Sequence, residues 1–262
     1  MEAIAFGVIR LTQAPLRAKP SDASEMVSQL LFGEHYEVLD LHKNKKWVRV
    51  KNIFDAYEGW LDINQHHPIS KEYFNQINQT EYKICTDLVS KILFKQQVNH
   101  ITFGAILPLL NNPIFKDEEN VAFNGSAKNV YQKLAVQSLI SHAQKLLNSP
   151  YLWGGRTPFG IDCSGFVQVV FRVAGYALPR DASQQVLMGK AINFEERLPG
   201  DLAFFTQKEG KVTHVGLLLE NDEIIHASGK VRIDVLRKEG IYKSKQNTYT
   251  HPLFKIKRIL KA

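Results

Sequence analysis

The sequence predicts an α+β protein in which one or two small SH3-like β-barrels precede a larger domain of helices followed by an antiparallel sheet. Two observations support this fold class. Short strand-like runs separated by turn residues fill residues 1–66. After residue 129, a helical pattern gives way to a series of strands. A chain of 262 residues is also longer than one small core needs, so two or three domains are expected.

Residues 1–66 contain four segments with strand-like alternation: IAFGVIRLT, HYEVLDLH, KWVRVKN and YEGWLDI. Such a meander of short strands is typical of an SH3-like barrel. Residues 17–34 are too long for a tight turn, and we expect them to cross the barrel surface. Residues 67–129 carry a weaker strand pattern and predict a second SH3-like β unit.

The third segment, residues 130–262, begins with apolar residues spaced three and four apart, which predicts an amphipathic helix over 130–148. The glycine-rich run YLWGGRTPFGIDCSG follows. Within it, Asp162 can cap a second helix that ends near Gly175. The remaining third alternates as strands, among them KVTHVGLLLE, EIIHAS and KVRIDVL.

Composition limits the function classes. The net charge of +7 is spread along the chain, and no basic stripe with interleaved aromatic residues indicates nucleic-acid binding. No apolar run approaches the ~20 residues of a membrane span, so we expect no membrane insertion. The first 22 residues lack the pattern of a signal peptide, which predicts a cytoplasmic protein, or a secreted or periplasmic one if a signal was removed.

Two cysteines exclude a disulfide scaffold and an all-cysteine zinc site, while one bridge between Cys85 and Cys163 stays open. Cys163 lies in the first turn of a predicted helix, directly after the glycine-rich run. The N–H groups and the dipole at such a helix end favour a thiolate, the reactive form of cysteine. For Cys85, a small buried hydrophobic residue is the favoured interpretation.

A nucleophilic cysteine needs a base and a group that orients the base. His214 and His226 lie in predicted neighbouring strands beyond Cys163, where they could form a Cys–His–His relay. Two core histidines, or a zinc site with Cys163, are the alternatives. Both histidines share a face only if paired residue numbers add to an even number, which requires a loop with an odd number of residues, such as 220–222, or a bulge. Gly216 would then lie opposite His226.

The segments YLWGGRTPFGIDCSGFV, PRDASQQ, LPGDLAFF, HVGLLL and IIHA, in this order, resemble the NlpC-type (NlpC/P60) cysteine peptidases of bacterial cell-wall metabolism. This resemblance covers about residues 131–262 and implies a papain-like catalytic domain. SEMVSQLLFGEHYEVL and DAYEGWL resemble the bacterial SH3-type units of γ-D-glutamyl-L-diamino acid endopeptidases.

The resemblance also implies residue roles. Cys163 matches the nucleophile, His214 the base, His226 the third polar residue, and Tyr151 a tyrosine whose hydroxyl joins the oxyanion hole. Further residues match positions that line the substrate groove or hold the substrate's free amine: Asp162, Ser164, Ser183, Glu25 and Tyr57. Glu25 as an exposed charge and Tyr57 as a core aromatic are the alternatives. Three more charged residues could bind substrate carboxylates or pair with one another: Arg156, Arg180 and Asp181.

The resemblance therefore implies a cysteine peptidase that hydrolyses the γ-D-glutamyl bond to meso-diaminopimelate or lysine in muropeptides with a free N-terminal L-Ala. Its expected partners are peptidoglycan-derived peptides, and its expected role is peptidoglycan turnover or recycling. No cofactor or metal is expected. An amidase or acyltransferase of the same fold and an inactive cell-wall-binding module are the alternatives.

Overall fold

The computed structural model describes residues 2–94, 96–107, 121–207, 210–244 and 246–260. It divides into two compact units. Unit 1 comprises Met1–Gln132 and Trp153–Thr157, and unit 2 comprises Lys133–Leu152 and Pro158–Ala262. The tryptophan-glycine segment before Cys163 thus packs with unit 1, although the chain on either side of it belongs to unit 2. Within the described residues, no helix is long and apolar enough to cross a membrane.

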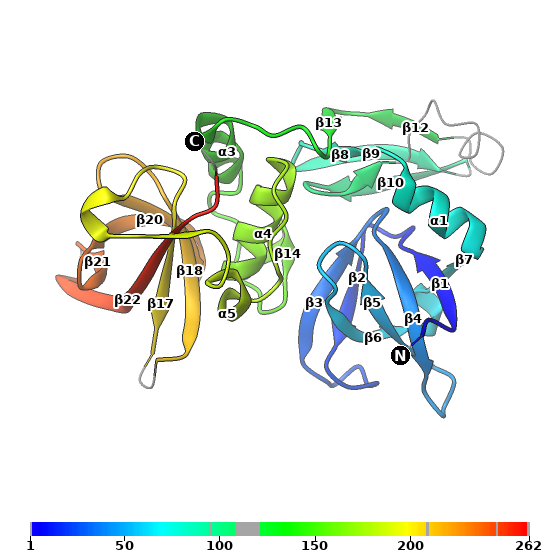
Figure 1. Cartoon of the computed structure of the whole chain (residues 1–262). Helices are drawn as coiled ribbons and strands as arrows, with labels where there is room; N and C mark the ends of the chain where they lie inside the picture. The colour runs from blue at the N-terminus through cyan, green and yellow to red at the C-terminus, as the bar shows by residue number, and fades with distance from the viewer. Residues whose placement is uncertain (1, 95, 108–120, 208–209, 245, 261–262) are drawn as a thin grey trace. The chain divides into compact units, whose positions relative to one another are not determined.

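Unit 1 begins with a seven-stranded antiparallel sheet in the order β3-β2-β6-β5-β4-β1-β7 (Figure 1). Its elements are β1 (Ala5–Val8), β2 (Gln13–Arg17), β3 (Met26–Leu31), β4 (His35–Leu41), β5 (Trp47–Asn52), β6 (Glu58–Asp62), the short 3-10 helix η1 (Ile63–Gln65) and β7 (His67–Ile69). Alternate residues of these strands fill one apolar core that includes Leu16, Leu30 and Tyr36. The segment 17–34 is not only a surface crossing, since it contains β3, whose Leu30 is buried in this core.

β7 pairs with β1, so the first sheet extends past residue 66. Ser70 then caps α1 (Lys71–Gln79) by accepting a hydrogen bond from the N–H of Tyr73. Two three-stranded sheets follow, in the orders β10-β9-β12 and β11-β8-β13. Their strands are β8 (Lys83–Cys85), β9 (Val89–Phe94), β10 (Gln97–Thr102), β11 (Ile106–Leu107), β12 (Val121–Asn124) and β13 (Ala127–Asn129).

This second β region shares an apolar cluster with the first sheet. Phe32, directly after β3, packs with Cys85, Ile92 and Ile101, and the backbone N–H of Ile106 donates to the carbonyl of Phe32. The predicted second β unit over 67–129 therefore forms strands, but it is joined to the first by a common core. Part of the predicted unit, residues 108–120, lies outside the described residues.

The helices of unit 2 are α3 (Val136–Lys145), α4 (Cys163–Val173) and α5 (Ala182–Gln185). α3 is shorter than the helix predicted over 130–148, because the chain is extended at Ala135 and turns out of the helix near Asn148, where φ is 68°. Every residue of α4 is buried, and α4 packs against α3, β18 and β19.

The sheet of unit 2 has the order β16-β22-β17-β18-β19-β20-β21, and β22 also pairs with β21. The small elements before and within it are β14 (Arg156–Thr157), β15 (Gly160–Ile161), β16 (Lys190–Ile192) and the 3-10 helix η2 (Phe194–Glu196). The longer strands are β17 (Leu202–Thr206), β18 (Val212–Leu218), β19 (Glu223–Ser228), β20 (Lys230–Arg237), β21 (Gly240–Lys243) and β22 (Thr248–Arg258).

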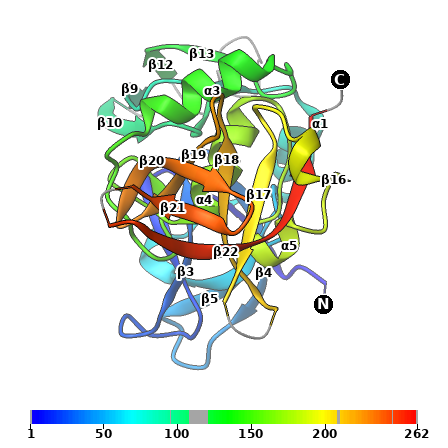
Figure 2. The ribbon, with the colours of Figure 1, turned by 90° about the vertical axis from the view of Figure 1, so that its left-hand side faces the viewer.

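Figure 1 shows α3, α4 and α5 along one side of this sheet. In the view of Figure 2, β20, β21 and β22 pass in front of α4. The expectation of helices followed by an antiparallel sheet is confirmed. The first residue of α4 is Cys163, so the helix that packs against β18 and β19 also carries the predicted nucleophile at its N-terminus.

The β18–β19 hairpin has the register that the sequence predicts. Leu217 pairs with Ile225 and Leu218 with Ile224, so paired numbers add to an even number. The N–H of Leu219 donates to the carbonyl of Glu223, which leaves a loop of three residues, 220–222. The histidines on the two strands therefore point to one face of the sheet.

Candidate active site

Cys163 lies against the open edge of β18. The last β18–β19 pair in this direction is Leu217–Ile225, so residues 213–215 of β18 are not paired with β19. The Cys163 sulfur is 4.0 Å from the carbonyl oxygen of Thr213, and it accepts a hydrogen bond from the N–H of Val215. Both backbone contacts flank His214, so the packing of α4 on β18 brings the thiol to the strand position of the predicted base.

The Cys163 thiol is protonated at neutral pH. Burial raises its pKa to about 12, and the negative charge of Asp162 adds to this shift. The N–H groups of Val215 and Ser164 and the charge of Arg180 act in the opposite direction but do not compensate. The expectation that the helix end favours a resting thiolate is therefore wrong, because the cost of desolvating the sulfur exceeds the stabilisation from the helix end. Nucleophilic attack requires a base to take the thiol proton.

His214 and His226 form a direct hydrogen bond. Nε2 of His214 lies 2.8 Å from Nδ1 of His226, and the two rings meet nearly at right angles. A Cβ atom on Gly216 would lie 3.0 Å from the Cβ of His226, so the absence of a side chain there makes room for the imidazole. Burial lowers the pKa of both histidines, most strongly for His214, so both rings are neutral near pH 7.

Two residues that sequence reasoning missed extend this pair. Nε2 of His226 is 3.1 Å from Oδ2 of Asp234, and Oδ1 of Asp234 accepts a hydrogen bond of 2.6 Å from Arg232. Arg232 lies opposite His226 in the β19–β20 ladder, and Asp234 is two residues further on the same face. Two signals in the sequence could have identified them: the turn at Gly229, which places β20 beside β19, and the alternation of β20, which puts Arg232 and Asp234 on one face.

His251 is a third histidine at the site that the sequence did not single out. Its ring centroid is 4.3 Å from that of His214 and 6.0 Å from that of His226. The backbone of His251 has φ 51°, near irregularities in the pairing of β22 with β17 and β21. Bulges of this kind redirect side chains. Burial and the nearby charges of His226 and Lys243 lower the pKa of His251 to about 4, so its ring is also neutral.

Tyr151 lies near the thiol. Burial raises the pKa of Tyr151 to about 12, and the negative charges of a Cys163 thiolate and of Asp162 add to the shift. The backbone of Tyr151 is held by a hydrogen bond to the carbonyl of Gly229 and by a parallel bridge to Ile161. Its hydroxyl is therefore a protonated donor at neutral pH, as an oxyanion hole requires.

Asp162 is already paired with a buried cation. Arg180 donates to both of its carboxylate oxygens, at 3.0 and 2.5 Å, and to the hydroxyl of Ser164 at 2.9 Å. Oδ1 of Asp162 also accepts from the N–H of Gly165, which caps α4. The partner of Arg180 is thus Asp162, a residue that the sequence analysis did not name for it.

Ser183 lies on the short helix α5 and is exposed. The structure brings together Cys163, His214, His226, Tyr151, Asp162 and Ser164 within unit 2.

Glu25 and Tyr57 belong to unit 1. Oε1 of Glu25 accepts a hydrogen bond of 2.6 Å from the indole N–H of Trp153. Gly154 follows with φ 77°, and a Cβ there would lie 2.3 Å from the carbonyl oxygen of Met26, so only glycine allows this approach. Tyr57 is partly buried against the barrel core. The predicted role of Glu25 and Tyr57 in holding a substrate amine stays a prediction.

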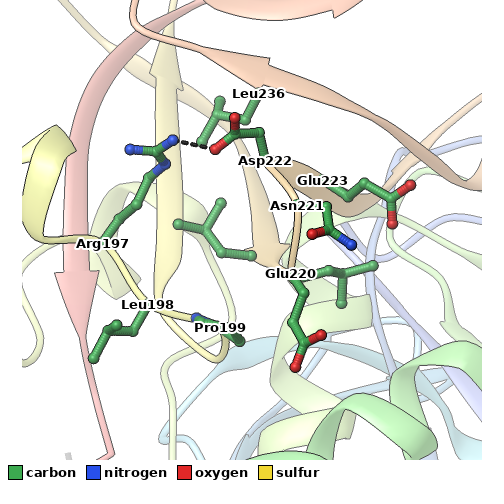
Figure 3. Close-up of a pocket in the computed structure, with 10 residues that line it drawn as sticks. Arg197, Leu198, Pro199, Glu220, Asn221, Asp222, Glu223 and Leu236 are labelled. Atoms are coloured by element: carbon green, nitrogen blue, oxygen red, sulfur yellow. Dashed lines mark hydrogen bonds and ion pairs between the residues drawn. The ribbon is translucent and has the colours of Figure 1, made fainter.

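Both cysteines are free thiols and buried, so no bridge joins Cys85 to Cys163. Among the described residues, no three or more His, Cys, Asp and Glu side chains are grouped to hold a metal ion. A cavity of about 430 Å³ lies at the turn of the β18–β19 hairpin (Figure 3). Arg197 and Asp222 form an ion pair at its edge, but none of the predicted site residues lines it. The predicted catalytic histidines therefore lie away from this cavity, toward the other end of the hairpin.

Comparisons with known proteins show which proteins the chain is similar to. Residues 148–250 match the NlpC/P60 family, and residues 16–65 match the bacterial dipeptidyl-peptidase Sh3 domain. A gamma-D-glutamyl-L-lysine dipeptidyl-peptidase of Bacillus subtilis is 30% identical over 222 residues, which are 76% of this chain and 71% of the relative. A protein of the same name from Bacillus cereus is 26% identical over 79% of this chain and 68% of the relative.

A crystal structure of an NlpC/P60 family protein from Bacillus cereus has the same fold, with a TM-score of 0.80 over 98% of this chain and all of that chain, at 21% identity. The predicted fold class, an NlpC-type domain preceded by an SH3-like domain, is confirmed by these matches. The chain belongs to the NlpC/P60 family of peptidases.

Proposed function

We propose that this protein is a cysteine peptidase that hydrolyses the γ-D-glutamyl bond to meso-diaminopimelate or lysine in muropeptides with a free N-terminal L-Ala. The observation that carries the proposal is the hydrogen-bonded chain from His214 through His226 to Asp234, beside a buried thiol at a helix N-terminus. Relatives named gamma-D-glutamyl-L-lysine dipeptidyl-peptidase support the bond and substrate class.

The reaction begins at a neutral thiol and a neutral imidazole. Nε2 of His214 is engaged by His226, so Nδ1 is the nitrogen that accepts the Cys163 proton. As the proton transfers, the sulfur attacks the γ-carbonyl carbon of D-glutamate and the carbonyl oxygen becomes an oxyanion. The Tyr151 hydroxyl and the N–H of Cys163 are the donors we assign to this oxyanion.

The carbon–nitrogen bond then breaks while His214 returns its proton to the departing amine of the diamino acid. A thioester between Cys163 and the L-Ala-γ-D-Glu dipeptide remains. Water attacks this thioester with His214 again as base, which releases the dipeptide and restores the thiol. No step needs a metal ion or a cofactor.

The free-amine requirement and the setting are also part of the proposal. Asp162 is neutralised by Arg180, so a second acid is needed to pair a substrate ammonium, and Glu25 on unit 1 is the residue we assign. We propose that the substrates are peptides from peptidoglycan turnover and that the enzyme acts in their turnover or recycling.

The test is incubation of the full chain with L-Ala-γ-D-Glu-meso-diaminopimelate, followed by mass analysis of the products. The expected products are the dipeptide L-Ala-γ-D-Glu and free diaminopimelate, with none from the Cys163→Ala variant. The lysine analogue and an N-acetylated tripeptide define the specificity. Cleavage of acyl amides or esters without cleavage of any γ-D-glutamyl peptide would contradict the proposal and favour an amidase or acyltransferase.

A further inference from the structure

We propose that Asp234 is a positioning residue that sets the protonation pattern of both histidines, and that Arg232 fixes which way Asp234 acts. The proposal rests on the proposed function only in that His214 serves as the base for Cys163. Among the described contacts, Asp234 touches neither His214 nor the Cys163 thiol. Its effect is transmitted through His226, whose Nε2 lies 3.1 Å from its Oδ2.

The argument starts from the carboxylate. An ionised carboxylate can only accept hydrogen bonds. Burial would raise the pKa of Asp234, but hydrogen bonds from His226 and Arg232 outweigh it and lower that pKa, so the group is ionised near pH 7. Nε2 of His226 must therefore carry a proton, and because the ring is neutral, Nδ1 of His226 has a lone pair.

The tautomer of His226 in turn determines the tautomer of His214. Nδ1 of His226 accepts, so the atom 2.8 Å away, Nε2 of His214, must donate and carry the proton. The pKa of His214 is lowered well below its ordinary value by burial and by the two neighbouring histidines, so this ring is neutral as well. Its Nδ1 is then left with the lone pair that a base needs. Asp234 thus determines that His214 rests as a base.

Because of Arg232, the protonation pattern depends on whether residue 234 is a carboxylate or an amide, even though the two groups have the same shape. A guanidinium only donates, and Arg232 holds Oδ1 of Asp234 at 2.6 Å. If Asp234 becomes asparagine, the amide oxygen must stay with Arg232. The amide NH₂ then occupies the position of Oδ2 and donates to Nε2 of His226. Every donor in the chain reverses, and Nδ1 of His214 ends up carrying a proton.

The charged and titratable groups near His226 come from several strands. Asp234 and Arg232 on β20 supply the constraint, and His214 on β18 receives it. The remaining two, Lys243 on β21 and His251 on β22, do not supply it. Lys243 acts on His226 only through its charge, which does not distinguish one tautomer from the other. The His251 ring is tilted against the His214 ring and lies nearly at right angles to the His226 ring, and its Nδ1 is hydrogen-bonded to the hydroxyl of Thr250.

The kinetic test compares Asp234→Asn with Asp234→Ala on the γ-D-glutamyl tripeptide. A packing or stability role predicts that the isosteric Asn variant is the milder of the two. The tautomer role predicts the opposite order, with kcat lowered by about 10²–10⁴-fold for Asn, the range of a lost general base, and by less for Ala. Asp222→Asn is the matched control, since Asp222 also pairs with an arginine in the same domain but touches no histidine. Its kcat is expected to be unchanged.

A second variant tests the role of Arg232. In Arg232→Ala/Asp234→Asn, the amide is released to turn its oxygen toward His226, which restores the original tautomers. We expect the kcat of the double variant to be at least about tenfold higher than that of Asp234→Asn, because restoring a general base can raise the rate by this factor or more. An unchanged or lower kcat in the double variant would contradict the proposal.

The tautomers can also be measured directly and without substrate. In ¹⁵N-labelled wild-type protein near pH 7, long-range ¹⁵N–¹H NMR spectra should show the proton on Nε2 of both His214 and His226. The Asp234→Asn spectrum should show it on Nδ1 of both. A wild-type His226 protonated on Nδ1 overturns the inference, even if no variant folds. If the wild type cleaves no γ-D-glutamyl peptide, the proposed function fails, while the NMR result still decides this inference.

Discussion

The guanidinium of Arg156 and the carboxylate of Glu34 form an ion pair in which both side chains are fully buried. The two nitrogens at the end of Arg156 each lie 2.9 Å from one oxygen of Glu34, and one of them also donates to the carbonyl of Gln29. Arg156 stands seven positions before Cys163, yet it belongs to unit 1. The partner of Arg156 is therefore Glu34, a residue that the sequence analysis did not name for it.

Removing one partner of this pair should destabilise the protein strongly. In Glu34→Ala the Arg156 charge remains buried without its carboxylate, and we expect a loss of about 3–5 kcal/mol in the free energy of unfolding. The control is Glu58→Ala, which breaks the exposed Arg49–Glu58 pair of the same unit and should cost about 0.2–1 kcal/mol. Urea unfolding of both variants measures the difference, and similar losses for the two would contradict the expectation.

Cys163 should react with iodoacetamide faster than Cys85, because Cys85 is enclosed in an apolar cluster while Cys163 lies at a strand edge. Burial raises the pKa of Cys163 to about 12, so its labelling rate should still be rising at pH 9–10. Mass spectrometry of peptides labelled across this pH range measures both effects. A rate that levels off below pH 7 would indicate a resting thiolate, contrary to the structure.

Tyr151→Phe should lower kcat by about 10²–10³-fold, the effect of losing one oxyanion donor, with little change in KM. Because the pKa of Tyr151 is raised to about 12, the hydroxyl should remain a donor throughout the range below pH 10. Tyr242→Phe, which loses only the hydrogen bond to Asn247, is the control and should retain wild-type kcat. Steady-state kinetics on the tripeptide test this, and an unaffected Tyr151→Phe enzyme would remove Tyr151 from the mechanism.

Glu25→Ala should reduce kcat/KM on the free-amine tripeptide far more than on its N-acetylated analogue. Glu25 is exposed in the free protein, and the bound substrate is expected to cover it. The expected loss on the free amine is then about 2–5 kcal/mol of transition-state binding, the scale for breaking a desolvated charge pair. Trp153→Phe, which removes the indole donor to Glu25, tests whether that hydrogen bond orients the carboxylate. Equal losses on both substrates would mean that Glu25 does not recognise the amine.

Acid should destabilise the protein partly through His251. Its pKa is about 4 in the folded state, against an ordinary value near 6.5, so the unfolded chain binds the proton more readily. Stability from this source is complete above pH 6.5 and is lost as pH falls from about 6.5 to 4. His251→Asn tolerates the positive φ and cannot titrate, so its unfolding free energy should change less between pH 7 and 5. A parallel pH profile for variant and wild type would contradict this.

Local patterns were enough to predict much of this protein. The glycine-rich run, the Asp162 cap and the apolar helix after it predicted where α4 begins and that Cys163 is its first residue. The period of two along the strands predicted that His214 and His226 share a face only if the loop between them has an odd number of residues or the ladder contains a bulge. Ordered motifs predicted the NlpC/P60 family. Each of these features depends on contacts between residues close in sequence. The shared face of the histidines depends only on whether a short loop has an odd or an even number of residues.

Long-range packing decided the rest. Whether Asp162 is an open carboxylate depended on Arg180 reaching it from eighteen residues away, and the ionisation of Cys163 depended on how deeply α4 buries its sulfur. His251 joined the site only because β22 returns to pair with β17, with an irregular turn of backbone that no propensity indicates. Hydrogen-bond partners and desolvation are properties of the folded arrangement, so these features of the site could be read only from the tertiary structure.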